Sequence, residues 1–177
     1  MHKVILDTDI GTDVDDALAL AVLLGSQTVD LLGITTVYGD TQLRSKIAMH
    51  ICDLVDRSVD TYVGESLPIS GREVWMSGEE GKNYKDLNRF NPESQGAVEY
   101  LVETIASNPN SIDIVAIGPL TNIARAIQIS QDFEKNVKQL WIMGGDFTQS
   151  RVEHNFKCDI DAARIVLESK IPISILD

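Results

Sequence analysis

Short apolar runs, many of them rich in β-branched residues, alternate with helix-like patterns along most of this chain. Most of the runs lack the polar–apolar alternation of a half-exposed strand, which is typical of strands buried on both faces of a parallel sheet. They lie at Lys3–Asp7, Asp30–Tyr38, Thr61–Val63, Ile112–Ile117, Gln139–Met143 and Pro172–Leu176. Apolar residues at helical spacing occupy Asp15–Leu24, Leu43–Val55, Ser94–Ser107, Leu120–Gln128 and Ile160–Glu168. The alternation predicts right-handed βαβ units, and therefore a three-layer α/β fold with a mostly parallel, Rossmann-like sheet and helices on both faces.

The size and charge of the chain limit its class. A length of 177 residues predicts a single α/β domain over residues 1–177 with a sizeable core. The net charge of −12 argues against nucleic acid or an anionic membrane surface as a partner, and it fits a cation or a neutral small molecule. No apolar run approaches the roughly 20 residues that span a bilayer. Cys52 and Cys158 form no disulfide framework and the sequence shows no signal peptide, which together predict a cytoplasmic protein.

One long segment interrupts the strand–helix rhythm. Gly64–Ser94 contains glycine, proline, charged residues and Trp75, but it shows no clear period. A loop of this length is uncommon in a compact domain and often has a function. The segment over residues 64–94 is therefore a candidate lid or binding loop, and a surface excursion without a function is an equally open reading.

Five aspartates lie within ten residues between the first predicted strand and the first predicted helix. They are Asp7, Asp9, Asp13, Asp15 and Asp16. Open α/β sheets bind ligands beyond the carboxyl ends of their strands, where this stretch lies. A helix cap explains one or two of the aspartates, but not five. Carboxylates gathered beside apolar walls need a cation, because unpaired charge is costly to remove from water, and hard oxygen ligands favour Ca²⁺ or Mg²⁺.

Three other interpretations of the aspartates differ in what they require. An EF-hand loop counted from Asp7 needs glycine and glutamate where this chain has Thr12 and Leu18, so it fails. A haloacid-dehalogenase-type phosphatase would use Asp7 as nucleophile with Mg²⁺, but the doublet Asp15–Asp16 follows too soon for that motif. A metal-stabilised binding module without catalysis remains open.

Several motifs together resemble the inosine–uridine-preferring nucleoside hydrolases. "DTDIGTDVDDALAL" is similar to the family signature, with Ile10 in place of the usual proline and two extra residues before Asp15. "ITTVYGD" resembles the second-strand motif, with Asp40 where asparagine is usual. "IGPLTNIA", "IMGGDF" and "VEHNFKCDIDAARIVL" match later motifs. The motifs occur in the family order and cover nearly the whole chain.

The resemblance implies a Ca²⁺-dependent N-ribohydrolase that releases ribose and free base in purine or pyrimidine salvage, and it favours a homo-oligomer. By that resemblance, Asp9 binds the ion and takes the proton from its bound water. Asp16 and the backbone carbonyl of Thr121 are further metal ligands, and Asp7 supports the cluster from behind.

The same resemblance implies the residues that hold the ribose. Asp15 would bind one hydroxyl, and Glu153 and Asn155 would bind the others. Asp40 and Met143 would line the ribose pocket, although Met143 fits a core position equally well. His154, next to this set, is better explained as a wall residue than as a catalytic acid.

The chain also departs from the family pattern. Relatives are much longer, and after the strand that corresponds to "ISILD" they carry a further calcium-binding aspartate and, in many members, a histidine near the leaving base. Because Asp177 ends a predicted core strand, we expect the N-terminal part of a longer nucleoside hydrolase fold. A naturally short metal- or ribose-binding member is the alternative. We also expect this chain alone to hydrolyse nucleosides poorly.

Overall fold

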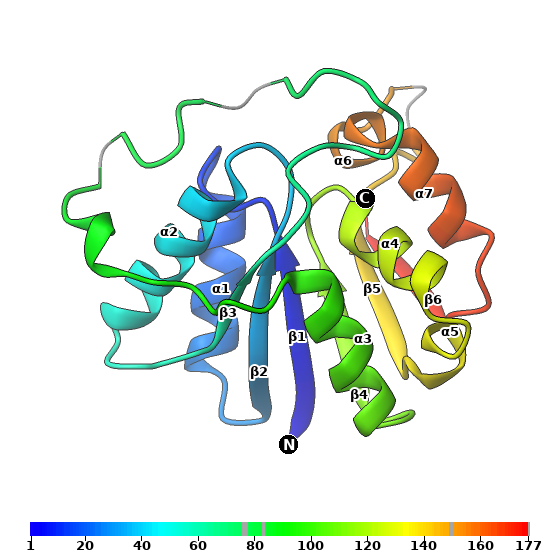
Figure 1. Cartoon of the computed structure of the whole chain (residues 1–177), viewed down its shortest axis with the longest axis horizontal. Helices are drawn as coiled ribbons and strands as arrows, with labels where there is room; N and C mark the ends of the chain where they lie inside the picture. Colours follow the sequence, from blue (N-terminus) through cyan, green and yellow to red (C-terminus); the bar gives the residue numbers. More distant parts are fainter. Residues whose placement is uncertain (76–77, 83, 149–150, 177) are drawn as a thin grey trace.

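The computed structural model describes residues 1–75, 78–82, 84–148 and 151–176 and contains one six-stranded sheet. The strands are β1 (His2–Thr8), β2 (Val29–Thr36), β3 (Thr61–Val63), β4 (Ile112–Ala116), β5 (Gln139–Met143) and β6 (Ile173–Leu176). Their order across the sheet is β3-β2-β1-β4-β5-β6, and each neighbouring pair is parallel (Figure 1). The predicted Rossmann-like α/β fold is confirmed. Asp177, on which the expectation of a longer fold rests, lies outside the described residues.

Two hydrophobic clusters lie on opposite faces of the sheet. Val4 and Leu6 of β1 point to one face and Ile5 to the other, as the two-residue period of a strand requires. The first face is covered by α1 (Asp15–Gly25) and α2 (Thr41–Asp53). The second is covered mainly by α3 (Ala97–Ser107), α4 (Thr121–Ile129) and α7 (Ile160–Leu167). Strands buried on both sides explain why the apolar runs in the sequence lack alternation.

The observed elements differ from the predicted ones mainly at their ends. β2 ends at Thr36, two residues early, because the chain turns at Tyr38 with φ of 67°. α2 begins at Thr41 and α3 at Ala97, two residues before and three residues after their predicted starts. Three one-turn elements have no counterpart in the prediction, because so short a helix shows no period: η1 (Leu87–Arg89), α5 (Phe133–Asn136) and α6 (His154–Cys158).

The strand order reverses between β1 and β4, which places a crevice at their carboxyl ends. The loop that follows β1, residues 9–14, enters α1 there, and we call it the aspartate loop. The turn after β4, residues 117–120, enters α4 beside it. Two segments that carry family motifs, the aspartate loop and the turn after β4, therefore lie next to each other at the carboxyl ends of the strands. No helix in the described part of the chain has the length and apolar character of a membrane span.

Candidate active site

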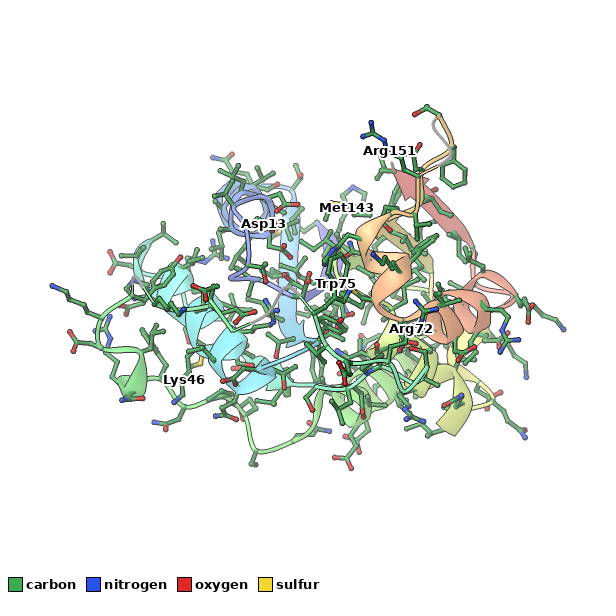
Figure 2. All side chains as sticks on the ribbon, turned by 90° about the horizontal axis from the view of Figure 1, so that it is seen from above. Asp13, Lys46, Arg72, Trp75, Met143 and Arg151 are labelled. Carbon is green, nitrogen blue, oxygen red and sulfur yellow. The ribbon has the colours of Figure 1, made fainter. Side chains whose placement is uncertain are left out.

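A cavity of about 400 Å³ opens at the carboxyl ends of β1 and β4. The aspartate loop and the start of α1 form one wall, and the chain from the end of β5 to α6 forms much of the other. Figure 2 looks down on this edge of the sheet, with Asp13, Trp75 and Met143 labelled around its centre. The lining residues are Asp9, Thr12, Asp13, Asp15, Asp16, Ile117, Met143, Gly144, Gly145, Glu153, His154, Asn155 and Leu176.

Asp9 is the buried carboxylate at the base of the aspartate loop, and only 7% of it is exposed. Burial, reinforced by the neighbouring Asp16, raises the pKa of Asp9 well above its usual value, while the charge of Arg44 opposes that rise. The turn after β4 packs directly on this residue. A Cβ atom added to Gly118 would lie 2.8 Å from Asp9 Oδ1.

Asp16 is buried in the first turn of α1, where the free N–H groups and the helix dipole favour a carboxylate. Thr8, the last residue of β1, donates a hydrogen bond to its Oδ1. Burial raises the pKa of Asp16 to about 7 despite that bond, and Asp15 and Asp13 add to the rise. The strand end and the helix start thus hold one carboxylate between them.

Asp13, Asp15 and Asp16 offer carboxylate oxygens that all lie within 4.8 Å of one another. Asp13 and Asp15 are exposed at the cavity mouth, and Asp16 is buried beneath them. A hydrogen bond with Asp15 raises the pKa of Asp13. The family resemblance implies no role for Asp13, because this residue lies in the two-residue insertion that the family signature lacks. Its acidic side chain within the crowded stretch was the available signal.

Asp7 lies behind the cavity, fully buried in β1. Its Oδ1 accepts hydrogen bonds from Thr35 Oγ1 at 2.6 Å and from Asn122 Nδ2 at 2.7 Å. Its Oδ2 is buried with no hydrogen-bond partner among the described residues. Burial raises the pKa of Asp7 to about 6. Asn122 also donates to the Thr36 carbonyl, so it ties α4 to β1 and β2.

Glu153 and Asn155 lie on the opposite wall, where they fix the start of α6. Glu153 is the N-cap, and its carboxylate accepts from the N–H groups of Asn155 and Phe156 at 2.6 and 2.9 Å. Asn155 Nδ2 donates to the carbonyls of Ile117 and Met143 at 2.9 and 3.1 Å. The asparagine therefore joins the ends of β4 and β5 across the cavity floor.

Three of the predicted site residues lie outside the set that lines the cavity: Asp7, Asp40 and Thr121. Asp40 is exposed and caps α2, since its Oδ1 accepts from Leu43 N at 2.9 Å. Thr121 is buried at the start of α4, and its hydroxyl donates to Asp159 Oδ2 at 2.8 Å. The roles implied for these residues by the resemblance stay predictions.

Comparison with known proteins identifies the family. Residues 4–177 match the model of the inosine-uridine preferring nucleoside hydrolases. The chain belongs to this family. The resemblance read from the motifs is confirmed, and it sets aside the phosphatase interpretation of the aspartates.

Individual nucleoside hydrolases match nearly all of this chain. The pyrimidine-specific ribonucleoside hydrolase RihB of Escherichia coli (strain HS) is 32% identical over 184 residues, which cover 97% of this chain and 58% of that protein. The structure of a plant nucleoside hydrolase, PpNRh1, superposes with a TM-score of 0.88 at 29% identity, over 99% of this chain and 59% of that one. A purine-preferring ribonucleoside hydrolase from Gardnerella vaginalis gives 0.82 at 27% identity, over 98% and 60%. The chain thus spans 58% of the length of the curated relative.

The site of this nucleoside hydrolase family member fits a hard divalent cation. Asp9 and Asp16 are buried acids whose pKa values are raised mainly by burial, so ionised carboxylates here lack sufficient compensating charge. Asp7 has a buried carboxylate oxygen without a hydrogen-bond partner in the described chain. Carboxylate oxygens are the ligands that Ca²⁺ and Mg²⁺ take. The donor set therefore suits such an ion and offers no described sulfur or histidine cluster for a softer one.

Proposed function

We propose that this protein is a Ca²⁺-dependent ribonucleoside hydrolase, which cleaves the N-glycosidic bond and releases ribose and a free base. The strongest support is that Asp9, Asp15 and Asp16 share one cavity with Glu153 and Asn155 at the switch point of the sheet. The relatives with purine and pyrimidine preferences belong to the same class of hydrolase. The resemblance also supports a homo-oligomer and a role in nucleoside salvage.

Asp9 is the proposed general base of this reaction. It directly follows β1, it is buried, and it lines the cavity in which C1′ of a nucleoside would lie. Asp9, Asp16 and the carbonyl of Thr121 would hold the Ca²⁺ ion. When bound, the ion acts as a Lewis acid and lowers the pKa of a coordinated water. Asp9 takes a proton from the attacking water, a role that contributes about 10²–10⁴-fold in rate.

The remaining carboxylates would orient the sugar and stabilise its developing charge. Glycosidic cleavage passes through an oxocarbenium-like state, and fixed negative groups around the ribose favour it. Asp15, at the cavity mouth, and Glu153, held by three backbone N–H groups, are the candidates for ribose hydroxyls. Because the amide nitrogen of Asn155 is already bonded to two carbonyls, its Oδ1 is the atom that would accept from a hydroxyl. Met143 lines the same cavity.

The test is Asp9-dependent release of ribose. The 177-residue chain is incubated with calcium chloride and either inosine or uridine, and ribose and base are quantified by a reducing-sugar assay and chromatography. We expect slow release that Asp9→Asn abolishes. The matched control is Asp132→Asn, which removes the same charge from an exposed pair with Lys135 and should leave the rate unchanged.

Two outcomes would contradict the proposal in different ways. Equal rates for the wild type and Asp9→Asn would remove Asp9 from the mechanism. Calcium-dependent stabilisation without release of ribose from either nucleoside would instead indicate the metal-binding module that the sequence left open.

A further inference from the structure

Arg44 carries a buried positive charge that the reaction itself does not use. It lies on α2 with 0% exposure, and its Nη2 is 2.8 Å from Glu80 Oε1. Glu80 is buried as well, although it belongs to the long segment between β3 and α3. A buried ion pair is a poor source of stability, because both charges lose their hydration. The burial of this ion pair therefore points to a role other than stability.

The guanidinium of Arg44 holds the backbone of the aspartate loop. Its Nη1 donates to the carbonyls of Asp9 and Ile10, the latter at 3.0 Å, and contacts Thr12 Oγ1 at 3.1 Å. One planar group thus reaches acceptors on three residues of the loop that contains the proposed general base. A lysine side chain has a single nitrogen and could not donate to all of these acceptors together with Tyr38 and Glu80.

The same side chain ties the aspartate loop to the turn after β2. Arg44 Nε donates to the carbonyl of Tyr38 at 2.7 Å. Tyr38 has φ of 67°, a left-handed conformation that bulky residues adopt rarely and at a cost. Arg44 is therefore bonded to the two loops that leave the carboxyl ends of β1 and β2.

Glu80 brings the long segment into contact with the aspartate loop. A Cβ atom added to Gly11 would lie 2.8 Å from Ile47 Cδ1 of α2 and 3.4 Å from Glu80 Cβ, so the loop backbone is packed between them. The segment is fixed on the other side of the sheet as well, since Asp159 accepts from the N–H groups of Ile69 and Ser70 at 2.7 and 3.1 Å. Figure 1 shows that the described parts of this segment lie over the top of the sheet, first beside α6 and α7 and then beside α2.

We propose that Arg44 is a positioning residue that fixes the aspartate loop for cation binding, and that Glu80 couples this loop to the seating of segment 64–94. The part of this inference that concerns the cation rests on the proposed function. The segment was predicted to be a lid or binding loop. At Glu80 the segment also serves as a strap, which is attached to α2 and to the aspartate loop through the Arg44–Glu80 ion pair and the hydrogen bond from Thr12 Oγ1 to Glu80 Oε1.

The first experiment measures calcium affinity in a variant that keeps the positive charge but loses the guanidinium group. Calcium chloride is titrated calorimetrically into Arg44→Lys, well below its melting temperature and after circular dichroism has shown it to be folded. We expect binding about 10–100-fold weaker than in the wild type, the usual effect of losing a group that orients metal ligands. Arg57→Lys is the matched control, because the Arg57 side chain donates only to the Leu24 carbonyl among the described hydrogen bonds. Unchanged affinity in folded Arg44→Lys would overturn the positioning role.

The second experiment needs no metal and no activity. Hydrogen exchange with mass spectrometry compares the wild type, Arg44→Lys and Glu80→Gln in the absence of calcium. We expect faster exchange in peptides that cover residues 9–14 in both variants, and near residue 80 in Glu80→Gln, with unchanged exchange in α3. Wild-type exchange of residues 9–14 in both variants would refute the coupling. A wild type that binds no calcium would contradict the proposed function, while the exchange data would still decide the role of Arg44.

Discussion

At the scale of single residues, Gly118 leads to a sharp prediction, because it has no room for a side chain beside Asp9. An added Cβ would lie 2.8 Å from Asp9 Oδ1 and 2.9 Å from its backbone nitrogen. We expect Gly118→Ala to displace Asp9, to weaken calcium binding about tenfold or more, and to lower the free energy of unfolding by about 1–3 kcal/mol. Calorimetric titration and urea denaturation measure the two effects.

The control for this substitution is Gly25→Ala. A Cβ atom there meets nothing within 4 Å, and Gly25 ends α1 far along the helix from the cavity. Because alanine favours a helix by up to about 1 kcal/mol over glycine, this variant should be as stable as the wild type or slightly more so. Equal calcium affinities for the two alanine variants would show that Gly118 does not set the position of Asp9.

The residues of the site differ in how far the sequence could identify them. The crowded acidic stretch between two buried elements indicates a bound cation, but only the family resemblance singles out Asp9 and Asp16 among its five aspartates. Arg44 has no such signal, because it occupies one position in an amphipathic helix pattern and its partners, Asp9, Tyr38 and Glu80, come from three separate loops. Contacts of that kind become visible only when the chain is folded.

At the scale of elements, Asp40 caps α2 and is also implied by the resemblance to line the ribose pocket. The two roles predict different effects of substitution. The Asp40 carboxylate accepts from Leu43 N and begins α2. We expect Asp40→Ala to lower the free energy of unfolding by about 1 kcal/mol through loss of the cap. Asp40→Asn keeps an oxygen acceptor and should retain that stability.

Comparison of these two variants tests the ribose contact that the resemblance implies for Asp40. Stability is measured by urea denaturation, and inosine binding by calorimetry on the same samples. Weaker nucleoside binding in folded Asp40→Ala than in Asp40→Asn would support the contact, because alanine removes the polar group and asparagine keeps one. Equal binding in the two variants would leave Asp40 with the capping role alone.

The strands and long helices are the elements that sequence patterns predict well. The long helices repeat an apolar spacing over several turns, as in α3, and the strands form apolar runs bounded by turn residues, as in β1. The one-turn helix α6 shows neither pattern, and yet its N-cap Glu153 and its second residue Asn155 line the cavity. Those two residues were found through the family motif, because a single turn is too short to show a period.

At the scale of the whole molecule, the position of the site follows from topology. The order β3-β2-β1-β4-β5-β6 puts the aspartate loop and the turn after β4 on either side of the switch point. The sequence predicts parallel strands, but it does not specify their order across the sheet, since that order depends on which direction each crossover takes. The strap formed by the described parts of segment 64–94 is likewise a whole-molecule feature, because its anchors, Arg44 on α2 and the α7 N-cap Asp159, lie on opposite sides of the crevice.

Calcium should stabilise the entire fold, because its proposed ligands come from separate elements. A ligand that binds only the folded chain adds RT ln(1 + [L]/Kd) to the free energy of unfolding, about 2.7 kcal/mol at a hundredfold excess over Kd. We therefore expect the melting temperature to rise with calcium chloride and to return to the apo value with a chelator.

The acidic chain, with a net charge of −12, could also attract calcium without a specific site. Asp16→Asn and Asp132→Asn separate these causes, since each removes one negative charge, but only Asp16 lies in the cavity. A specific site predicts that Asp16→Asn loses the calcium-dependent shift and Asp132→Asn keeps it, whereas equal shifts in both variants would reduce the effect to general charge screening.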